Sequence, residues 1–166
     1  MSLYPITVPV FIHAFRTLGA LLDKARAFAD ERGLPHAELL EARLHEDMGN
    51  LIYQVQRCSD TAKLAAVRLA QVENRPMEDK EQSFDDLQAR IAATVDFLEA
   101  VPAGAMDGRE EAEVILKTPS AEIPFTGLDY VRHFAVPNFY FHLATAYGLL
   151  RMKGVPIGKT DFLGRR

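Results

Sequence analysis

The sequence predicts an all-α protein, an up-down-up-down bundle of four amphipathic helices. Four long segments carry apolar residues at steps of three and four, and all but one of the connections between them are short. The 166 residues, 48% hydrophobic and 25% charged, suit one soluble globular domain over residues 1–166. A chain of this length buries a full core without disulfides or a structural metal.

The charge and the single cysteine narrow the class of protein. A formal charge of -4, with Lys and Arg scattered along the chain, argues against a nucleic-acid partner. Cys58 has no second cysteine to pair with, which suits a cytoplasmic location. No Lys or Arg precedes Arg16 and no run of eighteen apolar residues exists, so we expect neither a signal peptide nor a membrane partner.

The first two helices are predicted over residues 7–32 and about 35–72. Gly33 is the expected left-handed cap of the first helix. Gly49 and the pair Ser59-Asp60 are expected to weaken the second. Its apolar stripe, in which Cys58 is read as a small buried hydrophobe, consists of Leu40, Leu44, Met48, Leu51, Val55, Cys58, Ala62, Ala65 and Leu69.

A third helix is predicted from the N-cap Ser83 through Val101, with acidic residues in its first turn. It is followed by an irregular stretch in which residues 112–117 and 121–125 alternate between polar and apolar. These two segments flank Thr118-Pro119-Ser120 and predict a small β-hairpin. This longer connection separates the third helix from the fourth.

The last helix is predicted in two pieces, residues 128–134 and 138–153, because Pro137 removes a backbone donor. Gly154 and Pro156 end it. The remaining tail is expected to pack across the bundle through Val155, Ile157, Phe162 and Leu163.

Asn138 and His142 form the candidate site. They lie four residues apart on the apolar face of the last helix, so both side chains point inward and can reach one metal ion. Asp47 or His45, which fall on opposite flanks of the second helix, would supply a third ligand, and Gln54 an outer hydrogen-bond partner. The alternative is structural, with Asn138 capping or kinking the helix and His142 bonded to Asp47 or Gln54.

Three further residues are candidates for the cavity or for an interface: His133, Tyr140 and Tyr147. His133 would line the same cavity only if the break at Pro137 reorients it. Tyr140 and Tyr147 occupy the helix face opposite His142. This face is expected either to meet a second copy of the chain in a homodimer or to pack under the C-terminal tail.

Three stretches resemble a bacterial family known only as a domain of unknown function. They read PNFYFHLATAYGLLRMKGVPIGKTDFLG, LHEDMGNLIYQVQRCSDTAK and FDDLQARIAATVDFLEAVP, so the resemblance covers the whole chain. That family is grouped with the DinB/YfiT-like bundles, which are regarded as metalloenzymes. The resemblance therefore implies a DinB/YfiT-like four-helix bundle.

The DinB-like group typically binds nickel or zinc with one His on the second helix and an H-x-x-x-H pair on the fourth. Here Asn138 replaces the first His of the pair, His142 matches the second, and His45 lies near the second-helix position. The resemblance thus implies a degenerate metal triad in a protein of unknown function. The alternative is a divalent-metal-dependent hydrolase or a thiol-dependent transferase, and whether the chain is an enzyme stays open.

Overall fold

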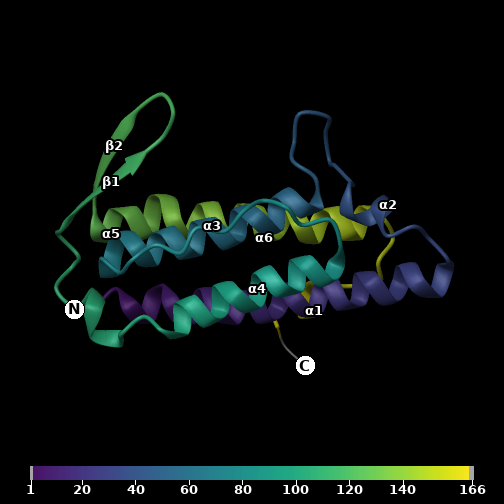
Figure 1. Ribbon diagram of the computed structural model, residues 1–166, viewed down its shortest axis with the longest axis horizontal. Helices are drawn as coiled ribbons and strands as arrows, with labels where there is room; N and C mark the ends of the chain where they lie inside the picture. Colours follow the sequence, from purple (N-terminus) through teal and green to yellow (C-terminus); the bar gives the residue numbers. More distant parts are fainter. Residues whose placement is uncertain (1, 165–166) are drawn as a thin grey trace.

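The computed structural model describes residues 2–164 and contains four long helices packed around one hydrophobic core (Figure 1). These are α1 (Val8–Arg32), α3 (Leu51–Ala70), α4 (Phe84–Glu99) and α6 (Val136–Met152). Shorter elements join them: η1 (Tyr4–Ile6), α2 (Ala37–Leu40), η2 (Ala103–Met106), α5 (Gly127–Tyr130), η3 (Val131–Ala135) and α7 (Lys159–Phe162). The predicted four-helix bundle is confirmed.

The helix directions differ from the predicted up-down-up-down order. The helix α4 runs antiparallel to α1, since Arg16 pairs with Glu99 and Arg26 with Asp85, and Figure 1 shows that α3 also runs against α1. The helices α3 and α4 therefore run the same way (Figure 1), and the connection between them returns along the whole bundle. The 71–83 segment can do so because its extended length of about 40 Å exceeds the roughly 30 Å of α3. We call this segment the strap.

The prediction of one helix over residues 35–72 is wrong. The chain forms the short α2, leaves helical structure over residues 41–50, and begins α3 only at Leu51. Asn50 starts the new helix because its side chain accepts a hydrogen bond from the Tyr53 backbone N–H at 2.9 Å. Leu44, expected in the apolar stripe, is 44% exposed on this loop. No weakening occurs at Ser59-Asp60, which lie within α3.

Three other predicted features are confirmed. Gly33 adopts φ 61° at the end of α1. Ser83 and Asp86 form a capping box at the start of α4, which ends at Glu99 rather than at Val101. The hairpin consists of β1 (Glu113–Lys117) and β2 (Glu122–Thr126), paired antiparallel. It projects from the same side of the bundle as the 41–50 loop, at the opposite end (Figure 1).

Pro137 does not separate two helices. Instead, α5, η3 and α6 follow one another directly, and η3 is a π-helical turn in which the Val136 N–H reaches the carbonyl of Val131. A wider turn accommodates a residue that lacks an N–H and whose ring would crowd the preceding turn. The helix therefore continues with a local change of pitch.

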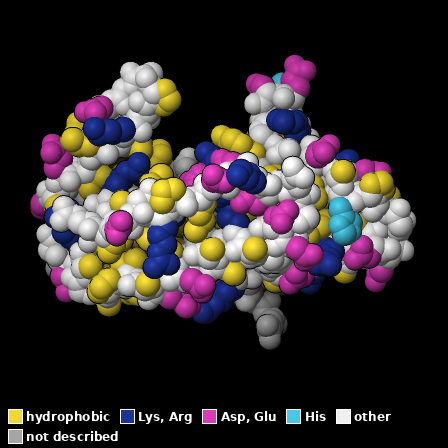
Figure 2. All heavy atoms as spheres, in the orientation of Figure 1, with side chains coloured by type: hydrophobic (Ala, Val, Ile, Leu, Met, Phe, Trp, Pro, Cys, Tyr) yellow, Lys and Arg dark blue, Asp and Glu magenta, His cyan; other side chains and the backbone are white. Residues whose placement is uncertain are grey.

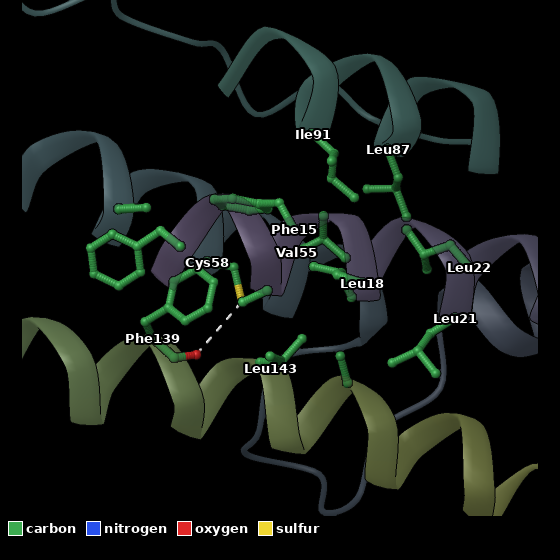
Figure 3. Packing of buried hydrophobic residues seen from close by; sticks show 14 of the residues in the cluster. Phe15, Leu18, Leu21, Leu22, Val55, Cys58, Leu87, Ile91, Phe139 and Leu143 are labelled. Atoms are coloured by element: carbon green, nitrogen blue, oxygen red, sulfur yellow. Dashed lines mark hydrogen bonds between the residues drawn. The ribbon is translucent and has the colours of Figure 1, made fainter. Parts of the chain in front are cut away.

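The core lies between α1, α3, α4 and α6. Phe139 packs against Phe11 and Phe15 with ring centroids 4.8 and 5.3 Å apart. Cys58 is fully buried beside it, with Sγ 3.7 Å from the Phe139 carbonyl (Figure 3), as expected of a small hydrophobe. This packing fixes α6 against α3 and so positions the next turn of α6, which carries His142.

Residues 4–32 are long and apolar enough to cross a membrane by length and composition alone. In this structure the apolar side chains of α1 form part of the core, including Phe11, Phe15, Leu18 and Leu22. Core helices of bundles commonly have this composition.

Candidate functional site

His142 lies on α6 opposite the start of α3, and its ring is hydrogen-bonded through one of its two nitrogens. Its Nδ1 lies 2.7 Å from Oε1 of Gln54, whose side chain is only 2% exposed. The amide nitrogen of Gln54 donates in turn to the carbonyl of Gly49 at 2.8 Å. The three residues form a short hydrogen-bonded chain from the 41–50 loop to α6.

This chain determines where the imidazole carries its proton. Because a backbone carbonyl can only accept, it fixes the Gln54 amide with its nitrogen toward Gly49 and its oxygen toward His142. An amide oxygen also only accepts, so Nδ1 of His142 must carry the hydrogen. The Nε2 atom is left with its lone pair. Within residues 2–164 it has no hydrogen-bond partner, yet it is not among the fully buried unpartnered atoms, so it is open to the adjoining cleft.

The imidazole is neutral at physiological pH. Burial and, to a smaller extent, the nearby positive charge of Arg57 together lower the pKa of His142 to about 4. A neutral ring with a hydrogen on Nδ1 presents a hydrogen-bond acceptor or a metal ligand at Nε2.

The cleft beside His142 has a volume of about 710 Å³. Two aromatic rings flank the imidazole edge-on, Tyr53 at 6.2 Å and Phe141 at 5.2 Å between centroids. They are 43% and 56% exposed, which is high for such large rings. The lining comprises Arg43, Asp47, Met48, Gly49, Asn50, Ile52, Tyr53, Gln54, Gln56, Asp79, Glu81, Phe141 and His142.

Asn138 and His142 do not converge on one point. The amide of Asn138 donates to Oγ1 of Thr61 at 2.8 Å, two turns further along α3 than Gln54. Each polar side chain of α6 is thus paired with its own partner on α3. The pairing of His142 with Gln54 was one of the two structural alternatives that the sequence left open.

His45 and Asp47 do not lie on a helix. Both are exposed on the 41–50 loop, where His45 Nδ1 lies 2.6 Å from Asp47 Oδ1. Asp47 lines the cleft and His45 does not. His133 is also exposed, 3.7 Å from Asp129, and lies outside the cleft lining.

These residues do not make the three-ligand set that the resemblance implies. Asn138 donates its amide to Thr61, and His45 points to Asp47 on an exposed loop. Among residues 2–164 no group of three His, Cys, Asp or Glu side chains could hold a metal ion. Of the triad of His45, Asn138 and His142 that the resemblance implies, only His142 presents to the cleft a nitrogen whose free lone pair could bind a metal ion.

Sequence reasoning missed Gly49 and Tyr53 as parts of the site. A Cβ on Gly49 would fall 2.1 Å from the Tyr53 ring, so only glycine lets the ring lie over this backbone. The dipeptide Gly49-Asn50 was a readable signal, because Asn is a preferred N-cap. The helical spacing of Leu40, Leu44 and Met48 obscured it.

Comparison with known proteins identifies first the fold class and then the family of this chain. A crystal structure of a DinB family member protein from Shewanella denitrificans superposes with a TM-score of 0.89 at 37% sequence identity, covering 99% of this chain and 93% of that one. The fold is therefore that of the DinB-like bundles. Residues 3–163 match the family described as a domain of unknown function, DUF1993, and the chain belongs to this family. No protein with a curated description matches the sequence.

Proposed function

We propose that the chain binds a small molecule in the cleft at His142, with Nε2 accepting a hydrogen bond from the ligand. The observation that supports this most directly is the Gly49–Gln54–His142 chain, which leaves Nε2 as an acceptor facing the cleft. The exposed rings of Tyr53 and Phe141 offer apolar contact on either side. The ligand is expected to join an apolar or aromatic body to a hydrogen-bond donor.

The pKa of His142 favours binding over general base catalysis. A catalytic base works best when its pKa is near the working pH, and His142 titrates at about 4. Cys58 is no stronger a candidate nucleophile, since burial raises the pKa of its thiol far above the ordinary value. At neutral pH His142 is therefore a weak base, and Cys58 is a protonated and weakly nucleophilic thiol.

The proposal can be tested with benzyl alcohol and toluene, which share a ring and differ in the donor. Binding is followed by the 15N chemical shifts of the His142 ring in the wild type, and by the backbone amide shifts of the cleft residues in both the wild type and His142→Phe. Benzyl alcohol should shift Nε2 of the wild type and toluene should not, while His142→Phe should lose the difference between them. A ring found with its proton on Nε2, or equal responses to both probes, would overturn the proposal.

A divalent-metal-dependent hydrolase or thiol-dependent transferase is the second candidate. It is supported by the free Nε2 of His142 and by Asp47 in the same cleft. Metal analysis of untagged protein decides between the two. Near-stoichiometric nickel or zinc that disappears in His142→Ala would replace the binding proposal, and protein that takes up neither metal would eliminate this candidate.

We also propose that the chain forms a homodimer through α6. Phe141 and Met152 of this helix are 56% and 53% exposed, and Leu44 is exposed close to Gly148. Large exposed apolar side chains on one helix are typical of interfaces. Tyr147 lies partly under the tail, 5.4 Å from Phe162. The test is the mass in solution of the variants considered in the Discussion.

A further inference from the structure

Three basic side chains lie together between α3, α4 and the strap, and we call them the cation cluster: Arg57, Lys63 and Arg90. The side chains of Arg90 and Lys63 are only 2% and 4% exposed. The helices provide one carboxylate for all three, that of Asp60, which lies 3.0 Å from Arg57 and from Arg90 and 3.7 Å from Lys63. Buried cations need compensating charge.

The strap supplies the other negative charges. Asp79 lies 2.6 Å from Arg57 and 3.0 Å from Arg90, and Glu81 lies 2.8 Å from Arg90. Burial alone would raise the pKa of Glu81, but hydrogen bonds from Arg90 and Gln56 outweigh it and lower the pKa. The two strap carboxylates therefore carry two negative charges into a region that the helices leave cationic.

Donors remain in excess even with the strap in place. Of the buried side-chain nitrogen and oxygen atoms in residues 2–164, those without a hydrogen-bond partner are Nε of Arg57 and Nε of Arg90. Nζ of Lys63 lies beyond hydrogen-bonding distance of Asp60. Unpaired buried donors are costly, so this cluster favours an anion whose oxygens can reach the two Nε atoms that the carboxylates leave without a partner.

We propose that Arg57, Lys63 and Arg90 form a binding site for a phosphate or phosphate monoester dianion, which Asp79 and Glu81 of the strap occupy intramolecularly. Guanidinium groups match the oxygens of phosphate in bidentate geometry. Two carboxylates have the charge of one phosphate dianion, so the exchange leaves the buried charge balanced. The strap thus acts as an autoinhibitory segment.

The strap carboxylates connect this site to the cleft. Asp79 and Glu81 line both the cation cluster and the His142 cleft, so an anion that displaces them also opens one wall of the cleft. The strap runs in front of α3 in Figure 1, and on this face acidic and basic side chains are interspersed (Figure 2). The inference goes beyond the proposed function, because the cation cluster does not include His142.

The test compares phosphate binding by the wild type and by Asp79→Asn/Glu81→Gln, using calorimetry with inorganic phosphate at constant ionic strength. Removing the intramolecular competitors should tighten phosphate binding by about tenfold or more. The control is Glu113→Gln/Glu122→Gln on the hairpin, which changes the net charge equally at a distance from the cluster. Succinate serves as a dicarboxylate comparison and should bind the strap variant less tightly than phosphate.

Two outcomes would overturn the inference. One is equal phosphate affinity in the strap variant and in the hairpin control. The other is phosphate binding by the strap variant that survives addition of Lys63→Gln, a change that removes one cation and leaves the buried Arg90 in place. The proposed function is tested separately, by the response of the wild type to benzyl alcohol in the absence of phosphate.

Discussion

The lowered pKa of His142 predicts a specific pH dependence of stability. In the unfolded chain this imidazole takes up a proton near pH 6.5, whereas in the folded protein it does so only near pH 4. Between these values the unfolded state binds more protons, so the free energy of unfolding falls as the pH is lowered through this window. His142→Gln removes this contribution while keeping a donor for Gln54.

The size of the effect follows from the two pKa values. A change from 6.5 to about 4 corresponds to at most about 3.4 kcal/mol between neutral and acidic pH. The side chain is only partly buried and solvent screens it, so we expect about 2 kcal/mol. The wild type should lose this much more free energy of unfolding than His142→Gln, a difference of roughly 4–8 °C in the melting temperature.

Urea denaturation above, within and below the pH window measures this difference directly. Other titrating groups cancel because they are shared by the two proteins. His133→Gln, which removes an exposed imidazole, controls for loss of a histidine as such. Parallel pH profiles for wild type and His142→Gln would show that His142 is not held neutral by burial, and the reasoning would fail.

Three further changes test the surrounding structure. Gly49→Ala should destabilise the protein by about 1–3 kcal/mol, measured by urea denaturation, because the new Cβ would lie 2.1 Å from the Tyr53 ring; no loss would show that the ring moves freely. Ser83→Ala should cost about 1 kcal/mol through loss of the α4 cap, again by urea denaturation, and an unchanged midpoint would contradict the assignment. Met152→Glu should shift the mass measured by light scattering toward monomer, because it places a charge on the exposed apolar face of α6, while Phe162→Ala, which removes the tail contact with Tyr147, should not; an unchanged mass in Met152→Glu would refute this dimer face.

Much of the fold was predictable from local sequence. The apolar spacing in α1, the Ser83 cap and the alternating strands of the hairpin are local signals that specify an element without reference to the rest of the chain. The second helix shows the limit of this approach. Leu44 and Met48 continue a helical period, but the cap at Asn50 starts a new helix, and spacing alone gives no means of weighing one signal against the other.

The direction of α4 was decided by tertiary structure. The strap reads as a polar loop, and such a loop permits either a tight turn or a return along the bundle. The ion pairs of Asp79 and Glu81 with Arg90 hold it extended, and these contacts join parts of the chain whose pairing has no sequence signature.

By itself the sequence determined a four-helix bundle of DinB type and a polar residue, His142, on the buried face of its last helix, because periodicity fixes which side chains face inward. Only the tertiary structure decided what His142 meets. Its partner Gln54 belongs to another helix, and the Gly49 carbonyl that orients Gln54 lies on a loop. Hydrogen-bond direction and burial depend on such distant contacts, so the protonation state of the site emerged only from the folded chain.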